Sequence, residues 1–184
     1  MESLIAERVV IITGGSAGIG RAAVEVFARN GARVVLAARG THRGQEVAAR
    51  LQAEGYHVLF VQADVSRPED VQRLIRTTVE SFGSIDCAFN NAANLANIRR
   101  SAEYSETEFD SEVALNLKSV WLCMKYEIEQ MKKQVPRGGA IVNTSSVNGL
   151  GGASGASLYS MAKAGVLALT LSLLLRSMPK TAFV

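Results

Sequence analysis

The stretch that decides the fold is RVVIITGGSAGIG, which occupies residues 8–20. Its first six residues, Arg8 to Thr13, are rich in β-branched side chains and stop abruptly at two glycines, as expected for a buried strand. A helical pattern then runs from Arg21 to Asn30, and Gly31 follows at its carboxyl end. Strand, glycine turn and helix in this order make the first unit of a dinucleotide-binding fold.

The glycines of residues 14–20 suit the binding of a phosphate. Glycine lets the backbone approach a pyrophosphate closely, and the amino end of the next helix offers free N–H groups and the positive end of a dipole. A glycine-rich turn that merely connects two elements is the simpler alternative. Because the turn lies between a buried strand and a helix start, we favour the phosphate-binding interpretation.

Strands and helices alternate along the rest of the chain. Ser66 with Glu69, and Ser105 with Glu108, have the spacing of capping boxes at two helix starts. The alternation predicts an α/β fold, a Rossmann-type doubly wound parallel sheet with helices on both faces, in a single domain over residues 1–184. The further expected strands are 33–38, 58–64, 85–90 and 140–144, and the further expected helices are 41–54, 66–82, 105–134 and 157–177.

Composition bounds the functional class. A chain of 184 residues, 48% of them hydrophobic, is long enough to bury a sizeable core. The net charge is +3, but the basic residues are scattered, so we expect no nucleic-acid partner. The amino end lacks a signal-peptide layout and the longest apolar run, residues 164–175, is too short to span a bilayer. We therefore expect a soluble cytoplasmic protein without a membrane partner.

Cysteine and histidine usage points away from a metal site. Cys87 and Cys123 each lie in an apolar stretch, so we expect buried free thiols in a reducing compartment. His42 and His57 are isolated from each other and from the cysteines. The sequence therefore predicts no metal ligand set.

The residues after the second strand bear on the choice of dinucleotide. An acidic residue there would hydrogen-bond the ribose 2′-hydroxyl of NAD, whereas an arginine accommodates the 2′-phosphate of NADP. Ala38 occupies the position of the acid, Arg39 follows it and Arg43 is near. A solvated loop arginine is the alternative. We expect NADP(H) to be favoured over NAD(H).

Tyr159 and Lys163 form a candidate acid–base pair. They are four residues apart on an expected helix, so their side chains lie one turn apart on the same face. The ammonium of Lys163 would favour the phenolate, which makes Tyr159 a general acid or base usable near neutral pH. An ordinary pair on a helix surface is the alternative, and this spacing alone is a weak signal.

Taken together, these motifs resemble the short-chain dehydrogenase/reductase family, in its compact single-domain branch. Residues 13–20 match its Thr-Gly-x-x-x-Gly-x-Gly cofactor motif. Residues 90–93 resemble its Asn-Asn-Ala-Gly signature with alanine in place of the glycine, which requires a backbone without positive φ there. The motifs and the resemblance together imply cofactor binding by Gly14, Ser16, Ala17, Gly18, Ile19, Gly20, Arg39, Asp64, Val65, Asn91, Ala92, Ala93, Tyr159 and Lys163.

The resemblance also implies a catalytic set. Asn116 matches the family's catalytic asparagine, and Ser146, Tyr159 and Lys163 match its Ser-Tyr-Lys triad. The thirteen-residue offset from Tyr159 selects Ser146 over Ser145. By resemblance, these residues imply hydride transfer between a ketone or aldehyde and the corresponding alcohol, which is secondary for a ketone. Ser146 would polarise the substrate oxygen, Tyr159 would exchange the proton, Lys163 would hold the nicotinamide ribose, and Asn116 would anchor a relay water.

Members of the family usually continue past the tyrosine–lysine helix into a sixth strand, a substrate-binding loop with its helix, and a seventh strand, whereas this sequence ends at Val184. We therefore expect an uncovered sheet beside the fifth strand and a half-built nicotinamide end. The alternative function is a truncated, catalytically inactive form that binds dinucleotide or acts through subunit association.

Apolar residues on the last two long helices bear on the oligomeric state. In the family, helices at these positions pair across a two-fold axis, so we expect a homodimer or homotetramer. Filling of the core is the alternative for any one of them. The residues concerned are Trp121, Met124, Leu167, Leu171 and Leu174.

Overall fold

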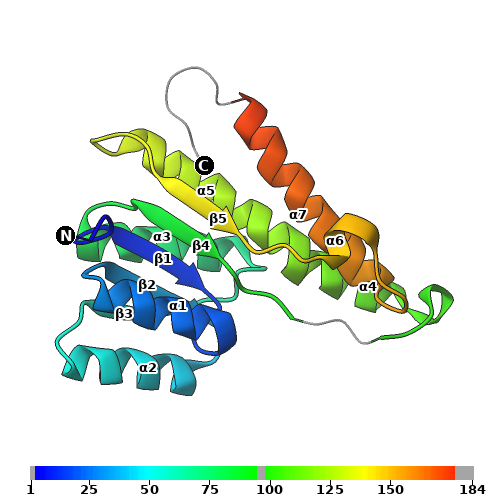
Figure 1. The fold of residues 1–184 in the computed structure, drawn as a ribbon, viewed down its shortest axis with the longest axis horizontal. Helices are drawn as coiled ribbons and strands as arrows, with labels where there is room; N and C mark the ends of the chain where they lie inside the picture. Colours follow the sequence, from blue (N-terminus) through cyan, green and yellow to red (C-terminus); the bar gives the residue numbers. More distant parts are fainter. Residues whose placement is uncertain (1–2, 95–97, 177–184) are drawn as a thin grey trace.

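The structure, a computed structural model, describes residues 3–94 and 98–176. Five strands form one parallel sheet in the order β3-β2-β1-β4-β5 (Figure 1). The strand order reverses between β1 and β4, which confirms the predicted doubly wound parallel sheet. The strands are β1 (Val9–Thr13), β2 (Arg33–Ala38), β3 (Val58–Gln62), β4 (Cys87–Asn90) and β5 (Ala140–Asn143).

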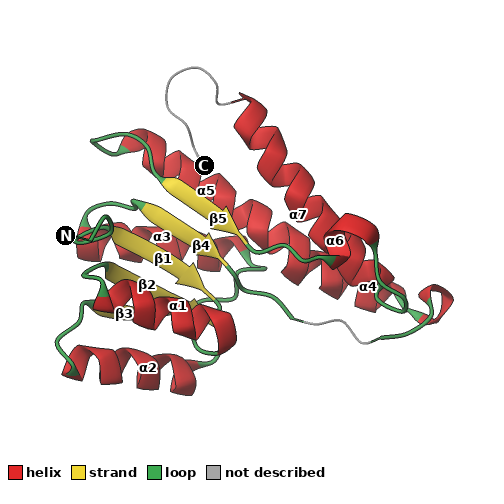
Figure 2. Ribbon diagram, viewed as in Figure 1, coloured by secondary structure: helices red, strands yellow, loops and turns green. Residues whose placement is uncertain are grey.

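Helices cover both faces of the sheet (Figures 1 and 2). α1 (Gly18–Arg29) and α2 (Thr41–Ala53) pack on one face, and α3 (Pro68–Phe82) and α5 (Ser119–Lys133) pack on the other. The remaining elements are η1 (Ser101–Glu103), α4 (Glu106–Val113), η2 (Ala114–Lys118), α6 (Asn148–Gly151) and α7 (Ser157–Arg176). Among the described helices, none has the length and apolarity that a membrane crossing requires.

Successive side chains along the central strands point to opposite faces of the sheet. Val10 and Ile12 of β1 pack toward α1 and α2, while Ile11 between them packs toward α3 and α5. In β2, Leu36 packs toward α1 and α2, and Val35 packs toward α3 and α5. All five of these side chains are fully buried, and each contributes about 1.5–3 kcal/mol by leaving water. The core therefore consists of two apolar layers, one on each side of β1 and β2.

The fifth strand is less well covered than the others. Every residue of β1 is buried, whereas no residue of β5 is, and Val142 is 56% exposed. β5 is the edge strand of the described sheet and pairs only with β4. The expectation of an uncovered sheet beside the fifth strand stays a prediction, because residues 177–184 lie outside the described part of the chain. Of the described residues of α7, Val166 packs against Val120 and Met124 of α5.

Of the two predicted capping boxes, one forms and one does not. Ser105 accepts a hydrogen bond from the backbone N–H of Glu108, and the Glu108 side chain bonds back to the Ser105 backbone, as predicted. The box at Ser66 and Glu69 is wrong. Helix α3 begins at Pro68, so Arg67 is the N-cap, and Ser66 donates instead to Asp64 while Glu69 pairs with Arg67.

The long helix predicted over 105–134 is interrupted. Between α4 and α5 the backbone widens into the π-helical segment η2, which has Asn116 at its centre. Segments of this kind occur mostly as single turns within α-helices and are frequent at functional sites.

The two cysteines differ from the expectation in one respect. Both thiols are free, and Cys123 is buried, but Cys87 is only partly buried.

Candidate functional site

A cleft of about 800 Å³ opens at the carboxyl ends of the strands, where the strand order reverses. Ligands of doubly wound sheets bind at this position because the loops on either side diverge there. Its walls come from the turn after β1, the start of α2, and the segments after β3 and β4. The lining residues that were predicted to bind cofactor are Gly14, Ser16, Ala17, Gly18, Arg39, Val65, Asn91, Ala92 and Ala93.

The glycine turn allows the close approach of two backbones. Gly14 has φ +70°, and a Cβ there would lie 2.9 Å from the Cα of Ala92. A Cβ on Gly20 would lie 2.3 Å from the carbonyl oxygen of Gly14, so Gly20 serves the closure of the turn itself. Gly18 has φ +52° and open space around its Cβ position. Side chains at these positions would strain the turn or block approach to it.

The amino end of α1 has the properties of an anion site. The helix starts at Gly18, three residues earlier than predicted and inside the glycine motif. Its N-cap, Ala17, supplies no side-chain hydrogen bond, and the first turn carries no acidic residue. The first N–H groups of the helix and the positive end of its dipole therefore meet the cleft without a capping side chain. A phosphate fits this arrangement.

The other end of the cleft carries two arginines and a histidine. Arg39, His42 and Arg43 line it, and within the described residues neither arginine forms an ion pair. This charge lies where the sequence predicts the 2′-phosphate of NADP. His42 was not predicted to line the cleft. Its position beside Arg43, in the first turn of α2, could have indicated it.

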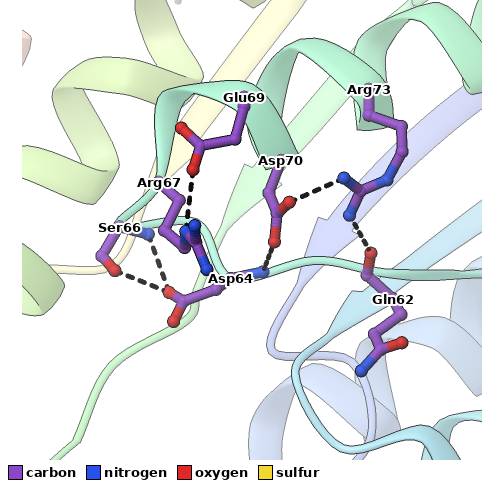
Figure 3. A network of polar contacts seen from close by, with 7 residues as sticks. All are labelled: Gln62, Asp64, Ser66, Arg67, Glu69, Asp70 and Arg73. Atoms are coloured by element: carbon purple, nitrogen blue, oxygen red, sulfur yellow. Dashed lines mark hydrogen bonds and ion pairs between the residues drawn. The ribbon is translucent and has the colours of Figure 1, made fainter.

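A hydrogen-bond network fixes the turn after β3 (Figure 3). The carboxylate of Asp64 accepts bonds from the backbone N–H and the hydroxyl of Ser66, at 3.0 and 2.7 Å. The backbone N–H of Asp64 donates to Asp70 (2.8 Å), and Asp70 pairs with Arg73 (2.7 Å). The hydrogen bond from Arg73, and then the one from Asp64, lower the pKa of Asp70. The turn thus presents Val65 to the cleft, while Asp64 itself does not line it.

The segment after β4 is clamped to the end of β1. The hydroxyl of Thr13 accepts from the backbone N–H groups of Asn91 (3.0 Å) and Ala92 (3.1 Å). The Asn91 amide donates back to the Thr13 carbonyl at 3.3 Å. Among the described residues, Glu7 is the only non-glycine with positive φ, so Ala93 meets the condition predicted for it.

Tyr159 and Lys163 come together at the end of β5. Lys163 is 1% exposed, and its ammonium donates to the carbonyl of Thr144 at 2.8 Å. Its Nζ lies 5.7 Å from the centre of the Tyr159 ring. Burial lowers the pKa of Lys163, and the charge of Glu112 opposes this shift. The side chain of Tyr159 is partly buried, and its hydroxyl makes no hydrogen bond to the described residues.

The two serines after β5 play different parts. The hydroxyl of Ser145 donates to the carbonyl of Lys163 at 2.8 Å, which ties β5 to α7. The hydroxyl of Ser146 accepts from the backbone N–H of Asn148 at 3.2 Å. A hydroxyl that accepts in this way keeps its proton for another partner. The geometry is therefore compatible with the predicted choice of Ser146 over Ser145.

Asn116 is fully buried and held on three sides. Its amide NH₂ donates to the side chains of Asn94, at 2.8 Å, and Glu112. Its amide oxygen accepts from the backbone N–H of Asn94 at 3.2 Å. The sequence motifs predict a functional role for Asn116 but not for its partners Asn94 and Glu112. Only the four-residue spacing of Glu112 and Asn116 could have indicated their contact.

Comparison with known proteins identifies the family. The family model described as short chain dehydrogenase matches residues 8–181. The chain belongs to the short-chain dehydrogenase family. It is 40% identical over 168 residues to an uncharacterized oxidoreductase of Thermotoga maritima, covering 90% of this chain and 64% of the relative. An A-factor type gamma-butyrolactone 1′-reductase of Streptomyces virginiae is 38% identical, covering 92% of this chain and 65% of the relative.

A third relative has a different printed activity. A 2,5-dichloro-2,5-cyclohexadiene-1,4-diol dehydrogenase of Sphingobium indicum is 38% identical, covering 89% of this chain and 64% of the relative. The chain thus spans just under two thirds of the length of these three relatives. The chain is therefore similar both to a relative named as a reductase and to one named as a dehydrogenase.

In this member of the family, the remaining predicted residues lie outside the lining of the cleft. Ile19 is exposed on α1, and Gly20 packs behind the glycine turn. Asn116 follows Leu115, which lines the cleft. Of the other three catalytic candidates, Ser146 precedes α6, whereas Tyr159 and Lys163 lie on α7, and Lys163 bonds to Thr144 after β5.

Proposed function

We propose that the chain belongs to an NADP(H)-dependent oxidoreductase that interconverts a ketone or aldehyde and the corresponding alcohol, which is secondary when the carbonyl substrate is a ketone. The observation that carries this proposal is the buried Lys163 beside Tyr159, at the same end of the sheet as the dinucleotide cleft. A tyrosine and a buried lysine so placed suit proton transfer to or from a substrate oxygen. The printed names of the relatives, reductases and dehydrogenases, agree with redox chemistry.

The residues of the cleft fit NADP(H). The glycine turn and the amino end of α1 would hold the pyrophosphate, and Arg39, with Arg43, would hold the 2′-phosphate. Lys163 uses one N–H on Thr144, so two further N–H groups of its ammonium remain for the nicotinamide ribose. When bound, the nicotinamide supplies or accepts the hydride.

Side chains of the protein would transfer the proton to or from the substrate oxygen and stabilise the negative charge that develops on it. Ser146 donates a hydrogen bond to the substrate oxygen and stabilises negative charge on it. Tyr159 gives a proton to that oxygen during reduction and takes one from the alcohol during oxidation. The cation of Lys163 stabilises the phenolate that forms on Tyr159. Asn116, buried behind them, supports the proton relay.

We also propose that the enzyme is a cytoplasmic homodimer or homotetramer. An apolar groove of about 530 Å³ runs between α5 and α7 and is lined by Leu117, Trp121 and Leu169, among others. Trp121 and Leu171 are exposed, whereas Met124 belongs to the core and Leu167 is partly buried. The side chain of Leu174 lies outside the described residues. A second copy of the chain would cover this apolar surface.

Calorimetry with NADPH and NADH tests the cofactor proposal directly. We expect micromolar binding of NADPH and weaker binding of NADH. Arg39→Ala should weaken NADPH binding by about 10- to 100-fold, because a charge-assisted hydrogen bond to the 2′-phosphate is lost, and leave NADH unchanged. Arg76→Ala is the matched control, since this exposed arginine lies on α3 outside the cleft.

The outcomes separate the parts of the proposal. Equal affinity for both dinucleotides would overturn the NADP preference alone. Binding of NADPH without turnover of any ketone in a panel would support the alternative of an inactive dinucleotide-binding form. Binding of neither dinucleotide would overturn the cofactor assignment.

A further inference from the structure

A buried carboxyl group lies behind the catalytic residues without a role in the scheme above. Glu112 is the one buried residue of α4 and is 6% exposed. Acidic side chains are almost never fully buried unless they are paired. Within the described residues, no arginine or lysine forms an ion pair with Glu112. Its hydrogen-bond donor is the amide of Asn116.

The contact with Glu112 fixes which way the Asn116 amide faces. An ionised carboxylate only accepts hydrogen bonds, so the NH₂ group of Asn116 must point toward Glu112. The side-chain oxygen of Asn94 accepts from the same NH₂ group, and the backbone N–H of Asn94 donates to the amide oxygen. A flipped amide would place its oxygen against two acceptors and its NH₂ against a donor. Glu112 thus contributes one of three contacts that exclude the flip.

Glu112 also lies on α4, which packs against α7, the helix that carries Lys163. Lys163 of α7 is the charged group that acts on Glu112, whereas Lys118 of η2 is exposed and the 91–94 segment contributes only asparagine and alanine. Burial raises the pKa of Glu112, and the Asn116 hydrogen bond and the Lys163 charge oppose that shift. In return, the charge of Glu112 opposes the loss of the Lys163 proton on burial.

We propose that Glu112 is a positioning residue of the catalytic site, which orients the buried Asn116 and places a carboxylate on α4, the helix that packs against the helix of Lys163. The proposal rests on the proposed function, because it assigns Glu112 a part in the acid–base chemistry of Tyr159. A lysine removed from water without a compensating anion gives up its proton more readily. Tyr159 would then lose its cation at the alkaline end of the working range.

Titration of Lys163 by NMR on the full chain tests the charge effect without any need for turnover. Lysine is labelled with ¹³C, and the Lys163 signal is assigned by its disappearance in Lys163→Met. In Glu112→Gln, which keeps a similar shape and an acceptor oxygen, we expect the Lys163 titration to shift to lower pH. Glu106→Gln removes an exposed carboxylate from the same helix and should leave the titration unchanged. An unshifted titration in Glu112→Gln would overturn the proposal.

A charge-conserving variant separates charge from shape. Glu112→Asp keeps the anion, so its Lys163 titration should lie closer to that of the wild type than that of Glu112→Gln does. Equal shifts in both variants would overturn the charge effect. In turnover, Glu112→Gln should move the alkaline limb of the kcat profile to lower pH and leave the KM for NADPH unchanged, and an unmoved limb would contradict the role in catalysis.

Failure of the proposed function is recognised separately. NADPH calorimetry on the wild type reports on the cofactor assignment whatever the state of Glu112. A wild type that binds no NADPH would overturn the proposed function, while the Lys163 titration would still decide whether Glu112 holds that lysine cationic.

Discussion

The centre of the sheet and its β5 edge differ in how deeply their residues are buried. Around β1 and β2, the central strands are buried between two apolar layers, and the loops that follow enclose a cleft. Around β5, the strand is an exposed edge, and Val147 and Leu150 beyond it are exposed as well. The cleft residues, apart from Leu115, lie within the first 93 residues, whereas Ser146, Tyr159 and Lys163 lie on the exposed side.

This difference teaches that the sites proposed for cofactor binding and for catalysis are supported by different parts of the fold. The cleft loops are tied by bonds between neighbouring strand ends, such as Thr13 with Asn91. The catalytic groups are tied mainly by Lys163 and Ser145, which join α7 to the end of β5. Segments with fewer buried contacts open at lower free-energy cost. Binding and chemistry should therefore fail independently when each part is perturbed.

The largest expected effect separates chemistry from binding. Tyr159→Phe removes the hydroxyl that exchanges the proton, so kcat with a ketone substrate should fall by about 10²- to 10⁴-fold. The dissociation constant of NADPH should change far less, because the cleft does not include Tyr159. Steady-state kinetics and calorimetry measure the two quantities. Tyr126→Phe, which removes a hydroxyl on α5, is the control, and an undiminished rate in Tyr159→Phe would remove it from the mechanism.

The second prediction concerns the contact between β4 and β5, where the centre of the sheet meets its edge. Glu127 of α5 is buried beneath β4, where it accepts a hydrogen bond from Asn90 at 3.0 Å, and Asn90 also bonds Asn143 of β5 at 3.0 Å. Burial raises the pKa of Glu127 to about 7, against the opposing hydrogen bond from Asn90. The folded protein therefore holds a proton there that the unfolded chain releases above about pH 4.

The sign of the pH dependence follows from this raised pKa. The stabilising contribution is complete below about pH 4, falls as the pH rises toward 7, and stays lost above that. A shift from 4.5 to about 7 corresponds to about 3 kcal/mol. Glu127→Gln should therefore be as stable as the wild type near pH 4 and more stable by up to about 3 kcal/mol at pH 8. Urea unfolding across this range measures the difference.

The exposed Glu129 on the same helix provides a control for Glu127. Glu129→Gln should show no comparable change of stability with pH. A constant difference between Glu127→Gln and the wild type from pH 4 to 8 would contradict the raised pKa of Glu127.

The sheet and its cleft were predictable because local patterns govern them. The β-branched runs, the glycine turn and the box of Ser105 with Glu108 each specify a structure through neighbouring residues. The predicted capping box at Ser66 does not form, for two reasons that involve Pro68 and Asp64. The proline starts the helix one residue too late for Ser66 to cap it, and the Asp64 carboxylate takes the serine hydroxyl.

The catalytic surroundings were less predictable because packing decides them. The sequence of η2, ALNLK, has ordinary helix propensity, so nothing local marks its π-helical path. Glu112 looks like a residue of a solvated helix face, and a lysine such as Lys163 is rarely buried. Motif matching found Asn116 and Lys163, but their partners Glu112 and Thr144 depend on contacts distant in sequence or on helix packing.

The third prediction perturbs the cofactor region alone. Gly14→Ala places a Cβ 2.9 Å from the Ala92 backbone at a residue with φ +70°, so it should cost about 1–3 kcal/mol and weaken NADPH binding. Gly151→Ala, in α6, meets open space and should do neither. Thermal unfolding and calorimetry measure both effects. Equal behaviour of the two variants would mean that the glycine turn tolerates a side chain.

The smallest expected effect tests the contrast between the interior of the sheet and its β5 edge by making the same substitution in each. Val35→Ala in β2 empties a fully buried site and should cost about 2–3 kcal/mol. Val142→Ala in β5 truncates a side chain that is 56% exposed, so its cost should stay below about 0.5 kcal/mol. Urea unfolding at low protein concentration measures both. A large cost for Val142→Ala would mean that the edge is covered in solution, and a cost that vanished on dilution would identify a second copy of the chain as the cover.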